Sequence, residues 1–345
     1  MSDIPIIDFS EFIHGSNEDK QRVARELDDA FHRVGFVYLK NHGVPSNMVD
    51  ECFTWSKKFF DLPLSTKMLA PHPPGGHHHR GYSAPGVEKV SQHVFDADEL
   101  SKLRENSLTT KTPDYKESFE SGNPTDATQP NIWPPEHVLP GFRTFLQTYF
   151  KTCAALLHAL LNALSVSLTL SSPGLSPTHF QSLFQLRLLH YPPTPASALR
   201  NNQLSRINAH SDFGSLTLLF QDNVGGLEIE SLQQPGVFHA VEPVEGAVLV
   251  NVGDLLERWS NGRWRSCVHR VGLPVLFQEE GGDWQEGKEE VVVPPRYSIP
   301  FFAMPDLETV IEALPGCWGE GRPKFFERVT AGEYVRMRLE ALYEG

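Results

Sequence analysis

Two histidines and one aspartate form the pattern in this sequence with the clearest chemical potential. His210 and Asp212 lie two residues apart, and residues at this spacing in a β-strand point to the same face. Such a pair is weak evidence by itself, because the chain contains 15 histidines. His269 strengthens it, since it lies in the alternating stretch 265–271, where a buried imidazole needs a polar partner. Two histidines and one carboxylate are the donor set of non-haem Fe(II) centres, which leave coordination positions open for substrates.

A second polar pair has the residue types to bind an anion. Arg296 and Ser298 show the same two-residue spacing, so a guanidinium and a hydroxyl would face one ligand carboxylate together. The residues expected on the same faces of this strand and of an earlier one are Pro300, Phe302, Arg187, Leu189 and Tyr191. The sequence therefore predicts a pocket that contains a metal, an anion clamp, an additional cation and aromatic walls.

Other histidines fit structural roles better than metal binding. The tract His77-His78-His79 lies in a stretch rich in Pro and Gly, so we expect it to be exposed or part of a lid. His42 is also expected to be structural. His190 has the opposite strand parity to Tyr191, which indicates a packed or hydrogen-bonded histidine outside the pocket.

Two other classes of protein remain open at this stage. A zinc hydrolase can use two histidines and one carboxylate, but it has no need for the Arg296 and Ser298 pair, and the sequence lacks an HExxH motif. A non-catalytic small-molecule binding protein on the same scaffold would be expected to lose a triad member or Arg296, and this chain keeps them all. Both alternatives are therefore disfavoured.

The elements that must position these residues follow from hydrophobic periodicity. Helical spacing predicts helices over 19–34, 46–60, 142–164 and 332–343. The segments predicted as strands are 35–39, 184–191, 215–221, 226–230, 247–251, 265–271 and 296–303. Many short strands in sequence favour a double-sheet jelly roll. The Pro- and Gly-rich residues 71–86 predict a loop over the surface or site, and the acidic run 278–290 predicts a solvated hairpin loop.

Composition narrows the class of protein further. The chain has 345 residues, 40% hydrophobic and 21% charged, which fits one large globular unit with a sizeable core. Its net charge of −13 argues against nucleic acid as a partner. The four cysteines lie far apart without a CxxC pair, which indicates a reducing compartment. The first residues lack the apolar stretch of a signal peptide, and the apolar stretch 153–164 is too short to span a bilayer, so we expect a cytoplasmic protein.

Several stretches resemble the signatures of the isopenicillin N synthase-like family of Fe(II)/2-oxoglutarate-dependent dioxygenases. They are GFVYLKNHG (35–43), LLHYP (188–192), HSD (210–212), GGL (225–227), NVGD (251–254) and RYS (296–298). Their order and spacing cover nearly the whole chain. The stretches RGYSAPG (80–86), TLLFQD (217–222) and PPRYSI (294–299) resemble fungal thymine-7-hydroxylase-like members of the family in particular.

This resemblance implies a mainly β protein with a distorted double-stranded β-helix (jelly-roll) core, a helical N-terminal region and flanking helices. We expect residues 1–140 to form the N-terminal region, with a lid loop at about 71–90, and residues 141–345 to form the long helix, the catalytic core and the C-terminal helix. The resemblance implies that His210, Asp212 and His269 bind Fe(II). It also implies that Arg296 and Ser298, helped by Tyr191, hold the distal carboxylate of 2-oxoglutarate.

The reaction implied is oxidation of a C–H bond with O2 and 2-oxoglutarate, which releases succinate and CO2. Arg187, Phe213 and Phe302 are the candidate substrate contacts, because a cation and flat rings suit a planar oxygenated ring. The thymine-type pattern has an Asn where this chain has Phe184, so the sequence favours a methyl or similar C–H on an aromatic secondary-metabolite intermediate over thymine. Desaturation and ring rearrangement stay open. We expect a small-molecule substrate and no nucleic-acid, membrane or obligate protein partner.

Overall fold

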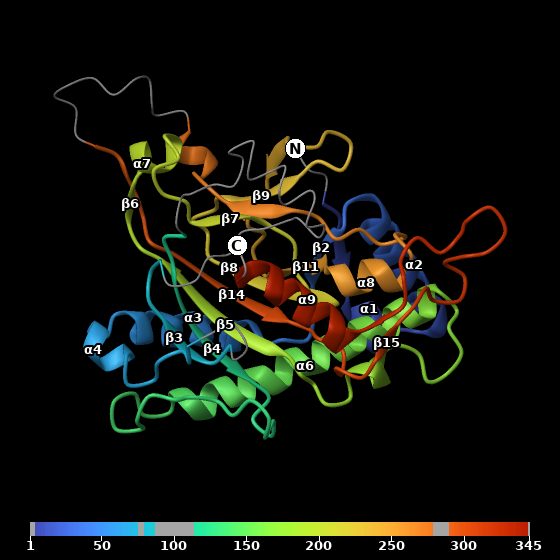
Figure 1. The fold of residues 1–345 in the computed structure, drawn as a ribbon, viewed down its shortest axis with the longest axis horizontal. Helices are drawn as coiled ribbons and strands as arrows, with labels where there is room; N and C mark the ends of the chain where they lie inside the picture. The colour runs from blue at the N-terminus through green and yellow to red at the C-terminus, as the bar shows by residue number, and fades with distance from the viewer. Residues whose placement is uncertain (1–3, 75–78, 87–113, 279–289, 344–345) are drawn as a thin grey trace.

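Two β-sheets form the framework of the molecule (Figure 1). The structure is a computed structural model that describes residues 4–74, 79–86, 114–278 and 290–343. The large sheet contains, in spatial order, β1 (Ile6–Asp8), β2 (Phe36–Lys40), β11 (Ala247–Val252), β8 (Leu216–Gln221), β14 (Arg296–Phe302), β5 (Gln185–Tyr191), β4 (Glu117–Gly122) and β3 (Gly81–Ser83). The small sheet contains β10 (Phe238–Ala240), β9 (Leu227–Glu230), β12 (His269–Val271) and β7 (Ile207–His210). This arrangement confirms the expected jelly-roll core.

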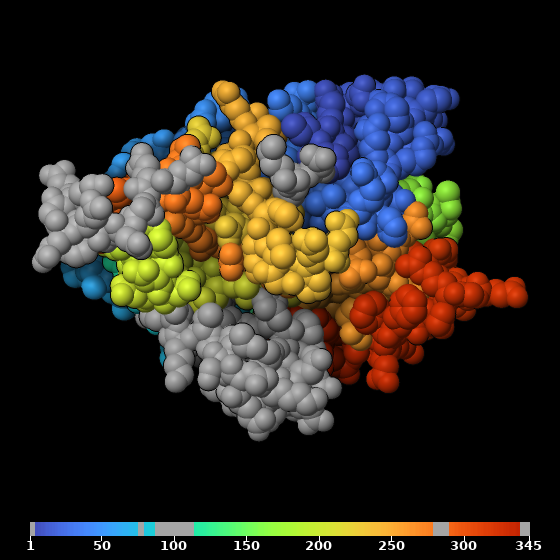
Figure 2. Space-filling view, turned by 90° about the horizontal axis from the view of Figure 1, so that it is seen from above, coloured from blue at the N-terminus to red at the C-terminus, as the bar shows by residue number. Residues whose placement is uncertain are grey.

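Helices flank the sheets, as expected. The α-helices are α1 (Ser10–His14), α2 (Asn17–Arg33), α3 (Ser46–Phe60), α4 (Leu64–Lys67), α6 (Phe142–Ser167), α7 (Ala196–Arg200), α8 (Asp254–Trp259) and α9 (Ala331–Tyr343). The remaining short elements are the 3-10 helices η1 (Ser176–His179) and η2 (Val275–Phe277) and the paired strands β6 (Thr194–Pro195) with β13 (Val292–Val293) and β15 (Val310–Ile311) with β16 (Val329–Thr330). In the view from above, the yellow residues of the small sheet occupy the centre of the surface (Figure 2).

The helices form where the sequence pattern predicts them. α2 begins at a capping box, in which the Ser16 side chain and the Asp19 side chain each bond the other's backbone N–H. Its buried face includes Val23, Leu27 and Phe31, and it packs against α6. α6 is long and apolar enough to cross a bilayer by length and composition, but half of its apolar window is buried inside the protein. We therefore interpret α6 as a core helix.

Strict alternation along β5 and β14 separates the core from the site. Leu186 and Leu188 belong to the core cluster on the helix side of the large sheet, as do Ile299 and Phe301. Residues of the opposite parity face the small sheet, where Tyr191 packs in a second cluster built from both sheets. The predicted pocket face is therefore the face that lies between the two sheets.

Two local predictions differ from the structure. Within the predicted loop 71–86, Gly81–Ser83 form β3 and extend the large sheet by pairing with β4, a strand that the sequence reading did not predict. The predicted strand 265–271 is regular only from His269, because the segment before it packs against Gly35, where a Cβ atom would lie 2.3 Å from the Arg265 carbonyl oxygen. Residues 75–78, 87–113 and 279–289, which include His77, His78 and the acidic run, lie outside the described residues.

Strands from both predicted regions share the large sheet. β1 to β4 come from residues 1–140, and they are hydrogen-bonded within one sheet to strands from 141–345. The division at residue 140 remains a prediction about the sequence, and the site below is built from strands on both sides of it.

Candidate active site

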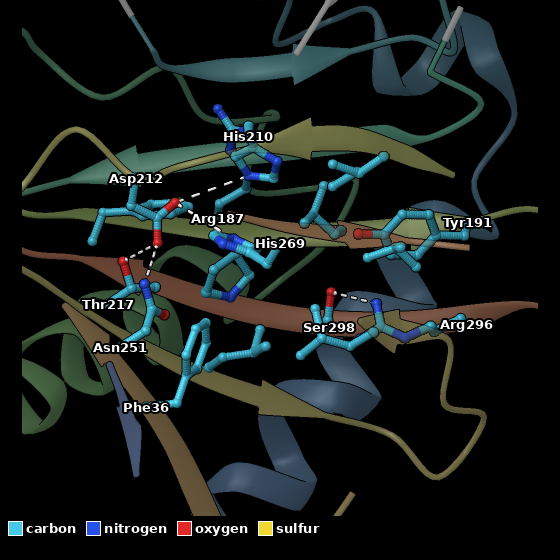
Figure 3. Close-up of a pocket in the computed structure, with 17 residues that line it drawn as sticks. Phe36, Arg187, Tyr191, His210, Asp212, Thr217, Asn251, His269, Arg296 and Ser298 are labelled. Carbon is cyan, nitrogen blue, oxygen red and sulfur yellow. Dashed lines mark hydrogen bonds and ion pairs between the residues drawn. The ribbon is translucent and has the colours of Figure 1, made fainter. Parts of the chain in front are cut away.

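His210, Asp212 and His269 meet at one end of the space between the sheets (Figure 3). The Nε2 atom of His210 lies 4.0 Å from Asp212 Oδ1, and Nε2 of His269 lies 3.9 Å from the same oxygen. β7 ends at His210, so Asp212 follows the strand and does not continue it, which differs from the sequence prediction. The histidines converge because they are cross-strand partners on β7 and β12.

Hydrogen bonds on the outer side of His210 and His269 decide which ring nitrogen faces the centre of the three residues. The Nδ1 atoms of His210 and His269 lie 2.9 and 3.1 Å from the carbonyl oxygens of Asn208 and Cys267. A carbonyl only accepts, so each neutral imidazole carries its proton on Nδ1 and turns the Nε2 lone pair inward. This donor set fits a divalent iron ion.

Asp212 is held in the ionised form that a metal ligand requires. Its Oδ2 accepts hydrogen bonds from Thr217 Oγ1 at 2.7 Å and from Asn251 Nδ2 at 2.8 Å, which leaves Oδ1 toward the histidines. Burial pushes the pKa of Asp212 upward, but the positive charge that His269 and His210 carry when protonated, together with these two donors, outweighs it and holds the pKa below its ordinary value. Thr217 and Asn251 are cross-strand partners on β8 and β11.

The other end of the pocket concentrates positive charge. Arg296 is buried, donates from Nη1 to Ser298 Oγ at 3.1 Å and from Nη2 to Gln221 Oε1 at 2.9 Å, and lies 5.1 Å from the ring of its cross-strand partner Tyr191. No carboxylate pairs with Arg296 among the residues that the structure describes. A buried guanidinium whose hydrogen-bond partners are neutral suits a ligand carboxylate.

A second guanidinium, Arg206, adds to this charge and was missed by sequence reasoning. It is fully buried, lies 5.8 Å from the Tyr191 ring and donates to the Pro294 carbonyl oxygen at 2.7 Å. Burial and the neighbouring Arg296 lower the pKa of Arg206 to about 10. Its signal in the sequence is its position four residues before His210, directly before the strand that carries an iron-ligand candidate.

Arg187 and Phe302 form a wall of the same pocket. Both residues line it, and the Arg187 guanidinium lies 5.7 Å from the centre of the Phe302 ring. Nη2 of Arg187 forms a 2.8 Å ion pair with Glu120, which is its cross-strand partner on β4. Glu120 is fully buried and also accepts from Gln185 Nε2 at 2.6 Å. Sequence reasoning missed Glu120 because it did not predict β4.

Two aromatic residues named in the sequence analysis lie outside the described pocket. Phe213, a candidate substrate contact, does not line the described pocket, and its ring lies 4.0 Å from the guanidinium of Arg338 on α9. This happens because the chain leaves the β7 strand before Asp212, so strand parity no longer applies. Phe184 is buried among Phe150 and Phe301 on the helix side of the sheet.

Four further histidines lie outside the group of candidate iron ligands. His190 donates from Nδ1 to Glu117 Oε1 at 2.7 Å and stacks on Tyr297, outside the pocket. His42 is buried, and its Nδ1 accepts from the Val44 N–H. His72, His79 and Glu120 form a second group with metal-binding atoms within 4.8 Å of one another. The ion pair of Glu120 with Arg187 disfavours a divalent cation there.

Comparisons with known proteins agree with this site. Residues 4–136 match the family model described as non-haem dioxygenase in morphine synthesis N-terminal, and residues 182–305 match the 2OG-Fe(II) oxygenase superfamily. The chain is 41% identical over 343 residues to the 2-oxoglutarate-dependent dioxygenase frbA of a Dothideomycetidae species, with 99% of this chain and 97% of the relative covered. It is 36% identical to the proline hydroxylase buaE of Petromyces alliaceus, with 98% of each covered.

A solved structure also matches this chain over nearly its whole length. The crystal structure of the full-length Neurospora crassa thymine-7-hydroxylase in complex with alpha-KG and thymine superimposes with a TM-score of 0.82 at 37% identity, covering 99% of this chain and 97% of that one. The fold and the donor set thus define a non-haem Fe(II) oxygenase. More particularly, the chain belongs to the Fe(II)- and 2-oxoglutarate-dependent dioxygenases, and it is an enzyme that acts on small molecules with Fe(II) and 2-oxoglutarate.

Proposed function

We propose that this dioxygenase hydroxylates a methyl or similar C–H bond on a planar, oxygenated aromatic ring of a neutral secondary-metabolite intermediate. The observation that carries the proposal is the wall of Arg187 and Phe302 beside the candidate iron ligands. A phenyl ring offers a flat stacking surface, and a guanidinium offers N–H donors to a ring carbonyl or hydroxyl.

The charge state of this wall favours a neutral substrate. Glu120 already balances the charge of Arg187, and both side chains are buried. A substrate carboxylate would have to compete with the Glu120 carboxylate for the same cation, and the repulsion between the two carboxylates would be strong in a buried site. A carbonyl or phenol oxygen needs only a hydrogen bond, so it costs no charge rearrangement.

We propose His210, Asp212 and His269 as the iron ligands, and Arg296, Ser298 and Tyr191 as the residues that hold the distal carboxylate of 2-oxoglutarate. The inward Nε2 and Oδ1 atoms support the first assignment, and the neutral hydrogen-bond partners of Arg296 support the second. The guanidinium of Arg206 adds positive charge on this side of the pocket, since it lies 5.8 Å from the centre of the Tyr191 ring. These residues bind and orient, and the two sheets exclude water.

Bound Fe(II) supplies the redox chemistry of the reaction, in which a C–H bond, O2 and 2-oxoglutarate yield a C–OH group, succinate and CO2. One oxygen atom enters the new hydroxyl group and the other enters succinate, so the oxidant and the reductant balance. The contribution of the chain is to hold the substrate C–H bond close to the metal by contacts at Arg187 and Phe302.

The first experiment tests the site assignment. Anaerobic protein is titrated with Fe(II) and then with 2-oxoglutarate, and the visible charge-transfer absorbance of the chelate is recorded for wild type and Asp212→Ala. A band in wild type alone supports the assignment. A band of equal strength in Asp212→Ala would contradict it.

The second experiment tests the substrate class. Succinate release is measured with methylated aromatic rings that carry a carbonyl or hydroxyl, with the same rings carrying a carboxylate, and with rings that carry no oxygen. We expect stimulation above the substrate-free rate only with the neutral oxygenated rings. Product mass separates the outcomes, since hydroxylation adds one oxygen atom and desaturation removes two hydrogens. Stimulation by the acids alone would overturn the proposal.

A second candidate is oxidation of a pyrimidine methyl group. It is favoured by the similarity to the structure of the Neurospora crassa thymine-7-hydroxylase with thymine. Phe184 does not argue against it, because the phenyl ring that stands where the thymine-type pattern has an amide is buried among core aromatics on the helix side of the sheet, away from the pocket. Thymine is therefore included in the panel, and turnover of thymine above every aromatic ring would favour this candidate.

We also propose that the enzyme acts in the cytoplasm without an obligate protein or nucleic-acid partner. Cys52, Cys153, Cys267 and Cys317 are buried free thiols, which suits a reducing compartment. Fractionation of cells that express a tagged copy tests the location, and enrichment in a membrane fraction would contradict it.

A further inference from the structure

Asp254, the first residue of α8, lies at the centre of a buried polar cluster behind the candidate iron ligands. Its Oδ2 accepts from Ser211 Oγ at 3.2 Å, and its Oδ1 accepts from Ser266 Oγ at 2.6 Å. Ser211 lies between His210 and Asp212, and Ser266 lies three residues before His269. One carboxylate therefore contacts both chain segments that carry the iron-ligand candidates.

The C-terminal helix supplies the counter-charge of Asp254. Arg338 of α9 forms a buried ion pair with Asp254, and Tyr334 one turn earlier donates to the same carboxylate oxygen at 3.2 Å. The Arg338 guanidinium also lies 4.0 Å from the Phe213 ring and donates from Nη2 to Ser211 Oγ at 3.5 Å. Figure 1 shows α9 crossing the molecule beside α8. Arg338 thus covers the back of the loop 210–213.

Backbone contacts make this loop responsive to Asp254. The Asp254 N–H donates to the Asp212 carbonyl at 2.8 Å, and the Gly253 N–H donates to the Ser215 carbonyl at 2.8 Å. At Gly253 the two segments pack so closely that a Cβ atom would lie 2.3 Å from the Gly214 oxygen. A shift of Asp254 would therefore shift the backbone of Asp212.

A buried ion pair is a weak source of stability, because desolvation of both charges offsets their attraction. The Asp254 and Arg338 pair is nevertheless bonded to Ser211, which lies between two iron-ligand candidates, and Asp254 also to Ser266, three residues before the third, and none of these groups lines the described pocket. This arrangement is better suited to fixing the positions of ligands than to stabilising the fold.

We propose that Asp254 and Arg338 are positioning residues for the iron site, through which the C-terminal helix α9 holds both iron-ligand segments in register. The proposal rests on the assignment of His210, Asp212 and His269 as ligands. It assigns α9 a role in metal affinity although α9 contributes no residue to the described pocket.

The test removes both charges together, because a single substitution would leave an uncompensated buried charge and could prevent folding. The variant is Asp254→Asn with Arg338→Met. Its dissociation constant for Fe(II) is measured anaerobically by the absorbance of the 2-oxoglutarate chelate, and we expect it to rise about tenfold, the lower end of what lost outer contacts cost metal sites. Saturating Fe(II) should restore a wild-type apparent affinity for 2-oxoglutarate, since Arg296 and Ser298 are untouched.

Two further variants separate positioning from general destabilisation. The matched control is Lys67→Met with Glu117→Gln, which removes another buried ion pair between α4 and β4. Because Glu117 also accepts from Tyr82 and His190, we expect the loss of these hydrogen bonds to lower the apoprotein melting temperature, while the Fe(II) dissociation constant stays within about twofold of wild type. Arg338→Lys keeps the charge and should recover part of the lost affinity. Equal loss of Fe(II) affinity in the control would overturn the proposal.

A measurement on wild type does not depend on any variant folding. If α9 and the iron ligands are coupled, Fe(II) with 2-oxoglutarate must slow amide hydrogen exchange in 331–343 as well as in 207–213, because coupling is reciprocal. Exchange that slows in 207–213 alone, or a double variant with wild-type Fe(II) affinity, would overturn this proposal only. Absence of a chelate band in wild type would overturn the site assignment and this proposal together.

Discussion

The candidate iron centre and the Arg187 wall beside it are built on different principles. At the candidate iron centre, Asp212 has its outer oxygen bonded by Thr217 and Asn251, and the histidines have their outer nitrogens bonded to backbone carbonyls. Three candidate ligand atoms thus point inward. At the Arg187 wall, the polar groups satisfy each other, since Glu120 pairs with Arg187 and Phe302 covers the guanidinium.

This difference separates general chemistry from choice of substrate. In the proposed assignment, Fe(II) balances the ionised Asp212 and the distal carboxylate of 2-oxoglutarate balances the charge of Arg296. The charge of Arg187 is already balanced by Glu120, so shape and hydrogen bonding would decide what binds at this wall. The chain is similar both to a protein named as a proline hydroxylase and to one solved with thymine.

The largest effect is expected from Asp212→Ala. Loss of this ligand should abolish the 2-oxoglutarate chelate band and reduce 2-oxoglutarate decarboxylation by about three orders of magnitude, because the metal supplies the chemistry. The measurement is succinate release with any substrate that stimulates wild type. His190→Gln is the control, since His190 faces away from the pocket, and it should keep the band.

Arg296→Met should weaken 2-oxoglutarate next. Loss of a buried charge-assisted hydrogen-bond donor costs about 2–3 kcal/mol, so the dissociation constant for 2-oxoglutarate should rise about 30- to 140-fold. Iron affinity measured without 2-oxoglutarate should be unchanged. The comparison variant is Arg206→Met. Arg206 does not line the pocket, so its loss should raise the dissociation constant for 2-oxoglutarate only about fivefold, by weakening the positive potential near Arg296. Equal effects would show that the clamp is not specific to Arg296.

A smaller and more selective effect is expected from Arg187→Met combined with Glu120→Gln, which removes the pair without stranding a carboxylate. The KM of the prime substrate should rise about tenfold, because one charge-assisted hydrogen bond is lost. Substrate-free 2-oxoglutarate decarboxylation should stay within about twofold of wild type. If substrate-free decarboxylation fell together with substrate turnover, the candidate iron centre and the Arg187 wall would not have the separate roles proposed here.

Phe302→Leu should have the smallest effect. The substitution keeps an apolar side chain but removes ring stacking, worth about 0.5–1.5 kcal/mol, so the KM of an aromatic substrate should rise about two- to tenfold. A non-aromatic substrate of similar size is the control and should lose less. If both substrates weaken equally, Phe302 acts through packing of Arg187 and not through stacking on substrate.

The sequence by itself determined the parts of this protein that depend on local pattern. Alternation put Arg187, Tyr191, Arg296 and Ser298 on the pocket face, and helical spacing found α2, α3, α6 and α9. The residue types of the triad and the clamp indicated the chemistry before any geometry was known. These predictions succeeded because the direction of a side chain repeats about every two residues in a strand and about every 3.6 residues in a helix.

Only the tertiary structure decided which residues are neighbours across elements. Glu120 balances Arg187 because β4 pairs with β5 in one register, and Thr217 with Asn251 hold Asp212 because β8 pairs with β11. Phe213 turns away from the pocket because the strand ends at His210, and Arg338 then covers it from the far end of the chain. Such contacts join residues about 40 to 130 positions apart, and no local period encodes a contact of that range.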